Sequence, residues 1–365
     1  MITRNEGMPG GRRPTLAFLG TGWIGRARLS AVVESGRADV VGVADPSPAA
    51  RAAALEIAPG AEPVAELGGL LELQPDGVVI ASPSALHAGQ AGRVLRHGAA
   101  VFCQKPLGRS EAETRLLIDT AKRTDRLLHV DLSYRYVDGI EALRSLVQQG
   151  EIGRVFAVDL TFHNAYGPDR PWFYSRRQAG GGCLLDLGTH LVDLALWVLD
   201  HPEPRTVRAH LFREGRPLDA SADHVEDFAA AEVEMEDGTL LRLACSWKLA
   251  AGRDAVIRAD FHGTEGGVSW RNVDGSFHDF GVERFSGTSR SSLVEGGGVA
   301  PRTWGGGAIL EWVDRLRRGG YYDRRVEEIL PVARLLDQMY RQGTTSAPQS
   351  RASRPAGSLL YRGGV

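Results

Sequence analysis

The sequence predicts an α/β protein in two parts: a parallel sheet covered by helices on both faces, then an antiparallel sheet. Over the first 130 residues, short apolar runs alternate with helical patterns, and the runs lack the polar alternation of half-exposed strands. After residue 150, apolar residues recur at every second position. The length of 365 residues suffices for two domains of ordinary size, each with its own core.

The first part is expected to contain five buried strands separated by helices. The predicted strands are residues 15–19, 40–44, 77–81, 100–103 and 127–132. The fourth strand is followed by Ser110-Glu-Ala-Glu113, a capping box that predicts the start of a helix reaching about Thr124. We place this domain at residues 14–133.

The second part, residues 134–342, shows the strand period of two. In residues 154–163, Phe156, Val158, Leu160 and Phe162 fall on one face of a predicted strand. Two further runs flank a hairpin turn, and a helical run interrupted by Gly188 lies before them. The expected strands are 228–235, 240–247, 256–262 and 268–270, and the expected helices are 183–199, 308–317 and 326–341. Residues 286–307 are expected to form a loop, residues 1–13 a disordered leader and residues 343–365 a disordered tail.

Composition narrows the class of protein. A net charge of −2 gives no general attraction to nucleic acid or to an anionic membrane. No apolar run approaches the roughly 20 residues of a membrane span, and the polar N-terminus lacks the apolar region of a secretory signal. The three cysteines are far apart, which favours a reducing compartment. We therefore expect a cytoplasmic protein.

A glycine fingerprint follows the first predicted strand. In Gly20-Thr-Gly22-Trp23-Ile24-Gly25, the first glycine permits a tight turn, the second lets main chain approach a pyrophosphate, and the third lets helix and strand pack closely. The helix start would then bind the phosphates. These residues predict a dinucleotide-binding site.

Asp45, at the end of the second strand, is placed to bind the ribose hydroxyls of the dinucleotide. Its charge would repel a 2′-phosphate, so we predict NAD. Arg51 is close enough in sequence to keep NADP as the alternative.

Two turns lie at the carboxyl ends of later strands. Ser82-Pro83 begins one and His87 ends it; Gln104-Lys105-Pro106 forms the other. A lysine leaving a strand beside a cofactor site can polarise a carbonyl or stabilise an alkoxide. A solvated surface lysine is the alternative, but the proline that follows fixes the turn and favours the functional interpretation.

A third pattern lies in the second part, where a run of three glycines precedes Asp186-x-x-x-His190. On a helix these two side chains share one face and can hydrogen-bond, and a histidine held by a carboxylate is a candidate general base. Three alternatives stay open: metal ligation with Cys183, a core histidine, and a helix-capping aspartate. No second His/Cys cluster supports a metal site, so we predict none.

Taken together, these motifs resemble those of the Gfo/Idh/MocA family. The resemblance covers residues from about 14 to 341. The matching pieces are the Gly20–Gly25 fingerprint, the turns at His87 and Lys105-Pro106, Tyr134-Arg135-Tyr136, and segments 150–153, 181–193 and 263–266. The resemblance implies a Rossmann domain followed by an α/β domain with a large, open, mostly antiparallel sheet. It also implies homodimers or homotetramers.

The resemblance implies an active site of Lys105, Asp186 and His190 at the nicotinamide. Lys105 would stabilise the reacting oxygen, His190 would act as general acid/base, and Asp186 would orient His190 or contact a substrate hydroxyl. The family's turn usually reads Glu-Lys-Pro, and Gln104 is a departure that removes a negative charge beside Lys105.

We expect the following cofactor and substrate contacts around an active site at the nicotinamide. The expected cofactor-binding residues are Gly20, Gly22, Trp23, Ile24, Gly25, Asp45, Ser82, Pro83, His87, Gln104 and Lys105. The candidate substrate-binding residues are Tyr134, Arg135, His163, Asn164, Trp172 and Lys248. Aromatic faces with a few polar groups suit a sugar ring, although aromatic residues at strand ends can equally cap a core. His87 can likewise cap its own helix.

These observations predict an NAD-dependent dehydrogenase acting on a secondary alcohol of a sugar, inositol or aminocyclitol. One alternative is an NAD-dependent hydrolase or lyase that oxidises a sugar transiently. The other is a catalytically silent dinucleotide-binding regulator.

Overall fold

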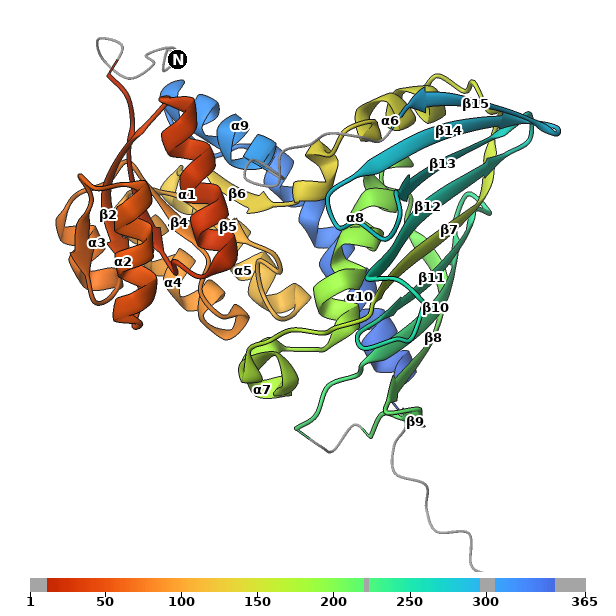
Figure 1. Cartoon of the computed structure of the whole chain (residues 1–365), viewed down its shortest axis with the longest axis horizontal. Coiled ribbons are helices and arrows are strands. Elements are labelled where there is room, and N and C mark those ends of the chain that lie inside the picture. The colour runs from red at the N-terminus through yellow and green to blue at the C-terminus, as the bar shows by residue number, and fades with distance from the viewer. Residues whose placement is uncertain (1–11, 220–222, 296–305, 345–365) are drawn as a thin grey trace, which may run out of the picture.

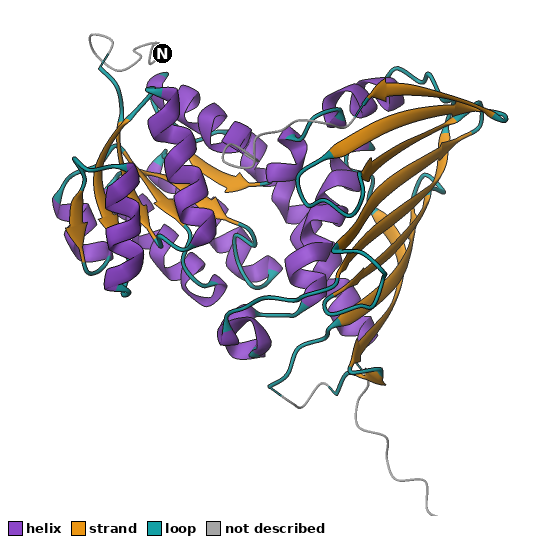
Figure 2. Ribbon diagram, in the orientation of Figure 1, coloured by secondary structure: helices purple, strands orange, loops and turns teal. Residues whose placement is uncertain are grey.

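The computed structural model describes residues 12–219, 223–295 and 306–344, arranged as two domains (Figure 1). The predicted leader and tail lie outside these residues, except for two residues of each. Figure 2 shows one domain with helices on both sides of its sheet and one domain with a broad sheet. The predicted fold class is confirmed.

The N-terminal domain contains a six-stranded parallel sheet in the order β3-β2-β1-β4-β5-β6. The strands are β1 Thr15–Leu19, β2 Asp39–Ala44, β3 Glu62–Val64, β4 Gly77–Ile80, β5 Ala100–Gln104 and β6 Leu128–Asp131. The helices are α1 Trp23–Ser35, α2 Pro48–Ile57, α3 Leu67–Glu72, α4 Ser84–His97 and α5 Glu111–Thr124. Only β3 and α3 were not predicted, because three exposed or half-exposed residues give β3 no buried run.

Local sequence explains where these helices begin. Ser110 Oγ accepts a hydrogen bond from Glu113 N at 3.2 Å, as the capping box predicts for α5. Ser47 Oγ caps α2 in the same way through Ala50 N at 3.3 Å. At the start of α1, by contrast, no side chain caps the helix, which leaves its N–H groups available to a ligand.

A helix from the end of the chain returns to this domain. α9, Gly306–Arg317, packs on α1 and places Trp312 and Ile309 in one apolar cluster with Leu16 and Phe102. A Cβ on Gly77 would lie 2.7 Å from the Trp312 ring, so β4 needs a glycine there. This helix is expected from the sequence to belong to residues 134–342. Its packing on the N-terminal domain was not predicted.

The C-terminal domain contains a nine-stranded sheet in the order β15-β14-β13-β12-β7-β11-β10-β8-β9. All neighbouring strands are antiparallel except β7 and β11. The strands are β7 Val155–Asn164, β8 Pro204–Arg213, β9 Arg216–Pro217, β10 Phe228–Met235, β11 Leu240–Ser246, β12 Ala255–Gly263, β13 Gly267–Asn272, β14 Phe280–Ser286 and β15 Ser289–Val294. The helices are α6 Ile140–Gln148, α7 Arg176–Ala179, α8 Thr189–Val198 and α10 Ile329–Gly343.

Two expectations for this domain were wrong in part. The predicted loop 286–307 contains β15, whose exposed polar residues gave no strand signal, while residues 296–305 lie outside the described part. In β7, Val158, Leu160 and Phe162 are buried as predicted, but Phe156 is 46% exposed. The helices α8 and α10 lie on one side of the sheet, between it and the N-terminal domain (Figure 1).

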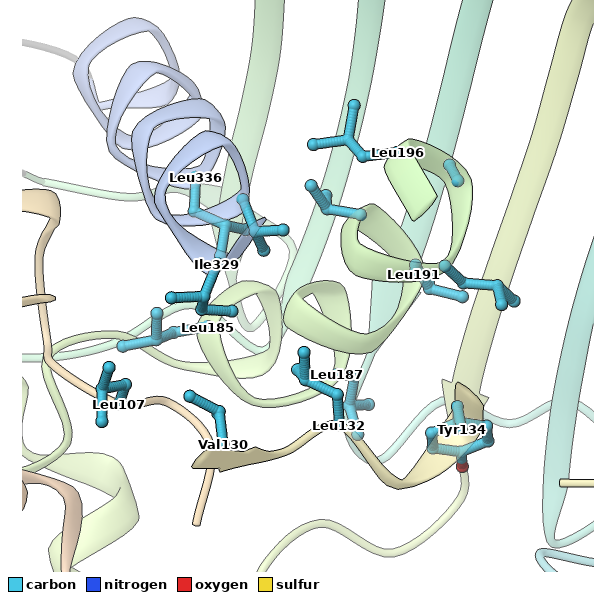
Figure 3. Packing of buried hydrophobic residues seen from close by; sticks show 14 of the residues in the cluster. Leu107, Val130, Leu132, Tyr134, Leu185, Leu187, Leu191, Leu196, Ile329 and Leu336 are labelled. Atoms are coloured by element: carbon cyan, nitrogen blue, oxygen red, sulfur yellow. The ribbon is translucent and has the colours of Figure 1, made fainter. Parts of the chain in front are cut away.

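One apolar cluster joins the two domains. Leu107, Val130 and Leu132 from the N-terminal domain pack near Leu185 and Leu187 (Figure 3). The described residues include one helical stretch, Arg176–Val198, with the length and hydropathy of a membrane span. Its most apolar window is 89% buried inside the protein, which is the pattern of a core helix.

Candidate active site

The glycine fingerprint forms the turn that the sequence predicts. Gly20 has φ +89°, and a Cβ there would lie 2.5 Å from the carbonyl carbon of Ala81, so only glycine fits. A Cβ on Gly25 would lie 2.0 Å from Gly20 O. Around Gly22, in contrast, a Cβ would meet nothing within 4 Å. This open space before an uncapped helix fits a pyrophosphate group.

Asp45 lies beside this turn. Its carboxylate accepts hydrogen bonds from Thr21 N at 2.8 Å and from Ser47 N at 2.9 Å. Arg51 donates to the main-chain oxygen of Asp45, so its guanidinium is held at the same strand end. Trp23 is 63% exposed and Ile24 half-buried on the first turn of α1. The residues expected to hold the adenosine half of a dinucleotide therefore gather at one edge.

His87 joins the two turns at the neighbouring strand ends. Its Nδ1 lies 2.7 Å from Pro106 O, and its Nε2 lies 2.7 Å from Ser82 O. Burial lowers the pKa of this imidazole below its usual 6.5. Because each ring nitrogen lies within hydrogen-bond distance of a main-chain oxygen, the geometry fits a residue that fixes the Ser82-Pro83 turn against the Lys105-Pro106 turn, whose peptide bond is cis.

Lys105 and Asp186 meet across the two domains. Lys105 Nζ donates to Asp186 Oδ1 at 2.6 Å and to Asp186 O at 2.9 Å. Trp247 Nε1, just beyond β11, donates to Asp186 Oδ2 at 3.2 Å. Both side chains of the ion pair are largely buried, at 16% and 20% exposed. Low local dielectric strengthens such a pair.

The predicted hydrogen bond between Asp186 and His190 is not formed. Asp186 lies in a π-helical turn, Leu184–Gly188, rather than in an ordinary α-helix. The wider turn alters the alignment of residues four apart, and the Asp186 carboxylate bonds to Lys105 and Trp247 instead. Asp186 is thus placed to orient Lys105.

His190 is the second residue of the following helix, α8, and is buried. The Tyr134 ring packs edge-on against its imidazole, with ring centroids 4.6 Å apart. Burial, followed by the positive charges of Lys105 and Arg28, holds the pKa of His190 well below its usual 6.5. The imidazole is therefore neutral at neutral pH, which is the form that accepts a proton.

Gln104 faces a buried ion pair. Its Nε2 donates to Asp131 Oδ2, and the same oxygen accepts from Arg28 Nε at 2.6 Å. Both charged side chains are at most 1% exposed. A negative charge is therefore present beside position 104, but on Asp131 rather than on the residue before Lys105. Neither Arg28 nor Asp131 was singled out from the sequence, since an arginine in a helix and an aspartate ending a strand are ordinary features.

Three of the candidate substrate-binding side chains have partners within the fold. Arg135 donates to Asp193 at 3.0 and 2.6 Å and to Glu328 at 2.6 Å, so its guanidinium is used within the fold. Tyr134 is 5% exposed and packs in the core. His163 bonds to Ser246 Oγ at 2.8 Å, and strand alternation places both on the face of the sheet away from Asp186.

Of the other candidates, Lys248 directly follows Trp247, Trp172 lies in the 3-10 helix Pro171–Tyr174, and Asn164 ends β7. Lys248 Nζ lies 4.8 Å from the Tyr174 ring centroid, and the Tyr174 ring packs against Trp247. Trp172 stacks on Phe173, which also packs against Trp247. Asn164 Oδ1 instead accepts from Tyr166 N at 2.8 Å, in a local turn. An aromatic and cationic group therefore surrounds Trp247, whose indole donates to Asp186.

Comparison with known proteins agrees with this fold. Residues 15–132 match the model of the oxidoreductase family with an NAD-binding Rossmann fold, and residues 140–269 match the GFO/IDH/MocA C-terminal domain. Fold and site together define a two-domain, NAD-binding oxidoreductase. The chain belongs to the Gfo/Idh/MocA family.

Curated relatives share part of their length with this chain. The putative UDP-kanosamine synthase oxidoreductase subunit of Amycolatopsis mediterranei (strain S699) is 34% identical over 66% of this chain and 70% of its own length. D-glucoside 3-dehydrogenase of Escherichia coli (strain K12) is 28% identical over 55% and 60%. Inositol 2-dehydrogenase of Rhizobium meliloti (strain 1021) is 29% identical over 70% and 74%. The chain thus spans about 60% of the glucoside dehydrogenase.

Solved structures match along nearly the whole chain. GenD2 from gentamicin A biosynthesis, determined in complex with NAD, gives a TM-score of 0.75 at 27% identity. The match covers 94% of this chain and 97% of that one. Within the described residues, no group of three or more His, Cys, Asp or Glu side chains is arranged to hold a metal ion.

Proposed function

We propose that this protein catalyses the NAD-dependent oxidation of a secondary alcohol of a sugar, inositol or aminocyclitol, or the reverse reduction. The observation that carries the proposal is the contact of Lys105 with Asp186, with a neutral His190 nearby, at the carboxyl ends of the Rossmann strands. Ligands bind at this edge of open α/β sheets.

The fingerprint residues and Asp45 would hold the dinucleotide, because the turn leaves open space before an uncapped helix. NAD supplies the hydride acceptor when bound. Asp45 favours NAD over NADP, since a 2′-phosphate would lie against its carboxylate. The Arg51 guanidinium donates one N–H to the Asp45 main-chain oxygen, and its other donors keep NADP as the alternative.

The roles of the three polar residues follow from their contacts. Lys105 would donate a hydrogen bond to the reacting oxygen and stabilise its developing negative charge. Asp186 orients Lys105 through two hydrogen bonds, which revises the role expected from the sequence. His190 would accept the hydroxyl proton, and in the reverse direction would return it.

The residues around Trp247 would form the substrate side of the site. Trp172, Tyr174 and Lys248 offer aromatic faces and a cation around Trp247, the partner of Asp186, which suits a polyhydroxylated ring. The names of two relatives, a glucoside 3-dehydrogenase and an inositol 2-dehydrogenase, support this substrate class. We also propose a cytoplasmic homodimer or homotetramer, without a nucleic-acid or membrane partner.

A substrate screen tests this function. Inositols, aldoses, amino sugars and aminocyclitols are incubated with the protein and NAD, and NADH formation is followed. Net NADH from a free polyol supports the dehydrogenase. Release of a leaving group without net NADH indicates the hydrolase or lyase alternative. Binding of NAD without turnover of any compound, together with a biological effect that survives Lys105→Met, indicates the regulator.

A further inference from the structure

Glu226 is a buried carboxylate that the proposed reaction does not use. Its Oε1 accepts hydrogen bonds from Gly182 N at 2.9 Å, from Leu184 N at 2.9 Å and from Tyr340 Oη at 2.7 Å. The residue is 0% exposed. The two main-chain donors lie at the start of the helical segment 183–198, four and two residues before Asp186.

The main-chain oxygens of Glu226 and Asp227 bond to two elements that adjoin Asp186. Glu226 O accepts from Cys183 N at 3.1 Å, and Asp227 O accepts from Trp247 N at 2.8 Å. One dipeptide, Glu226-Asp227, thus contacts the segment that carries Asp186 and the residue whose indole donates to Asp186. The segment that carries Asp186 and the hydrogen-bond partner Trp247 are thus both held by this short stretch before β10.

Tyr340, on α10, completes the arrangement. Its hydroxyl donates to Glu226 and accepts from Leu185 N at 3.1 Å. The first N–H groups of a helix have no partner within the helix, and a carboxylate placed there is favourable. Glu226 and Tyr340 therefore bond to the main-chain N–H groups of four consecutive residues, 182–185.

This packing also explains the glycine run before Asp186. A Cβ on Gly181 would lie 1.9 Å from Tyr340 Oη, and a Cβ on Gly182 would lie 1.9 Å from Glu226 O. These two glycines therefore allow the main chain to approach Tyr340 and Glu226 closely.

We propose that Glu226, with Tyr340, is a positioning unit that sets the start of the 183–198 segment and through it the place of Asp186. This rests on the proposed function, in which Asp186 orients Lys105. The unit acts from behind the segment and does not touch the reacting groups. Loss of the unit should displace Asp186 from both Trp247 and Lys105.

The indole N–H of Trp247 reports on Asp186 without any substrate. In protein labelled with ¹⁵N at tryptophan, the Trp247 resonance is assigned with Trp247→Phe and compared in Glu226→Ala, Glu226→Gln and Tyr340→Phe. The matched control is Tyr322→Phe, which removes a tyrosine–glutamate hydrogen bond of 2.6 Å to Glu327, away from the site. NAD affinity is measured in parallel by titration calorimetry.

We expect the Trp247 resonance to shift in Glu226→Ala and in Tyr340→Phe, and to stay in place in the control. Glu226→Gln retains an acceptor oxygen and should stay close to the wild-type position. With an identified substrate, kcat of Glu226→Ala should fall about 10- to 100-fold, while KM and NAD affinity change little.

An unchanged Trp247 resonance in both Glu226→Ala and Tyr340→Phe would overturn the proposal. If Glu226→Ala does not fold, the Trp247 resonance in Tyr340→Phe alone tests the proposal. A different result separates this proposal from the proposed function. If the Trp247 resonance shifts in Glu226→Ala and Tyr340→Phe but Lys105→Met keeps full turnover, the positioning unit is supported and the proposed function is contradicted.

Discussion

Lys105 Nζ lies 2.6 Å from Asp186 Oδ1, in a contact that connects the Rossmann domain to the large sheet domain. A second hydrogen bond, to the main-chain oxygen of Asp186, fixes the ammonium from another direction. An ammonium has three N–H donors, so within the described residues one remains for a substrate oxygen. This geometry defines what the first substitution should do.

Lys105→Met should lower kcat by about 10²- to 10³-fold, the usual effect of removing one hydrogen-bond donor to a developing oxyanion. NAD affinity should stay within a few-fold of wild type, since the fingerprint and Asp45 are unaffected. Steady-state kinetics and calorimetry measure the two quantities. Lys122→Met, on the exposed side of α5, is the control and should leave both unchanged.

His190→Gln should lower kcat by about 10²- to 10⁴-fold, because a proton acceptor is lost from the site. In the wild type, burial and the charges of Lys105 and Arg28 lower the pKa of His190. The neutral base is then retained as pH falls, so the acid limb of the kcat/KM profile should lie below pH 6.5. An acid limb at or above that value would contradict a role for this imidazole.

Gln104→Glu should lower the free energy of unfolding by about 3 kcal/mol, because a second carboxylate would be buried beside Asp131. Asp131→Asn should destabilise the fold by roughly 3–5 kcal/mol, since it leaves the Arg28 charge without this partner. Urea unfolding measures both changes.

The double variant Gln104→Glu/Asp131→Asn restores one carboxylate for Arg28. It should recover most of the stability lost in either single variant. Additive losses in the double variant would show that the two positions do not share one charge.

Asp45→Ser should weaken NAD binding and narrow the preference for NAD over NADP by about tenfold, because the carboxylate that would bind the ribose and repel a 2′-phosphate is removed. Thr21 N and Ser47 N lose their acceptor in this variant. Asp45→Asn keeps an acceptor oxygen and separates the effect of charge from the effect on the turn. Equal use of both dinucleotides by the wild type would contradict the predicted preference.

Much of the fold could be predicted because its signals are local. The Gly20–Gly25 turn, the capping box at Ser110 and the period of two in β7 each depend on neighbours in sequence. The packing of Trp312 on Gly77 depends on residues more than 200 positions apart, and no local pattern indicates it.

The candidate site, like the fold, could be predicted only where its signals are local in sequence. Lys105 and Asp186 were singled out by motif, but the spacing of Asp186 and His190 assumed an α-helical turn where the structure has a π-helical one. Gln104 was recognised as unusual, while its partners Asp131 and Arg28 come from other elements. Glu226 could not be singled out from the sequence, because it bonds to main-chain N–H groups whose positions depend on the fold.

Deuterium transfer distinguishes net hydride transfer to NAD from transient oxidation of the sugar. A substrate found by the screen is prepared with deuterium on the carbon that carries the reacting hydroxyl, and the products are analysed by mass spectrometry. The proposed dehydrogenase should form one deuterated NADH for each ketone, with formation lost in Lys105→Met and kept in Lys122→Met. Deuterium that returns to the sugar product, with a leaving group released and no net NADH, would contradict it.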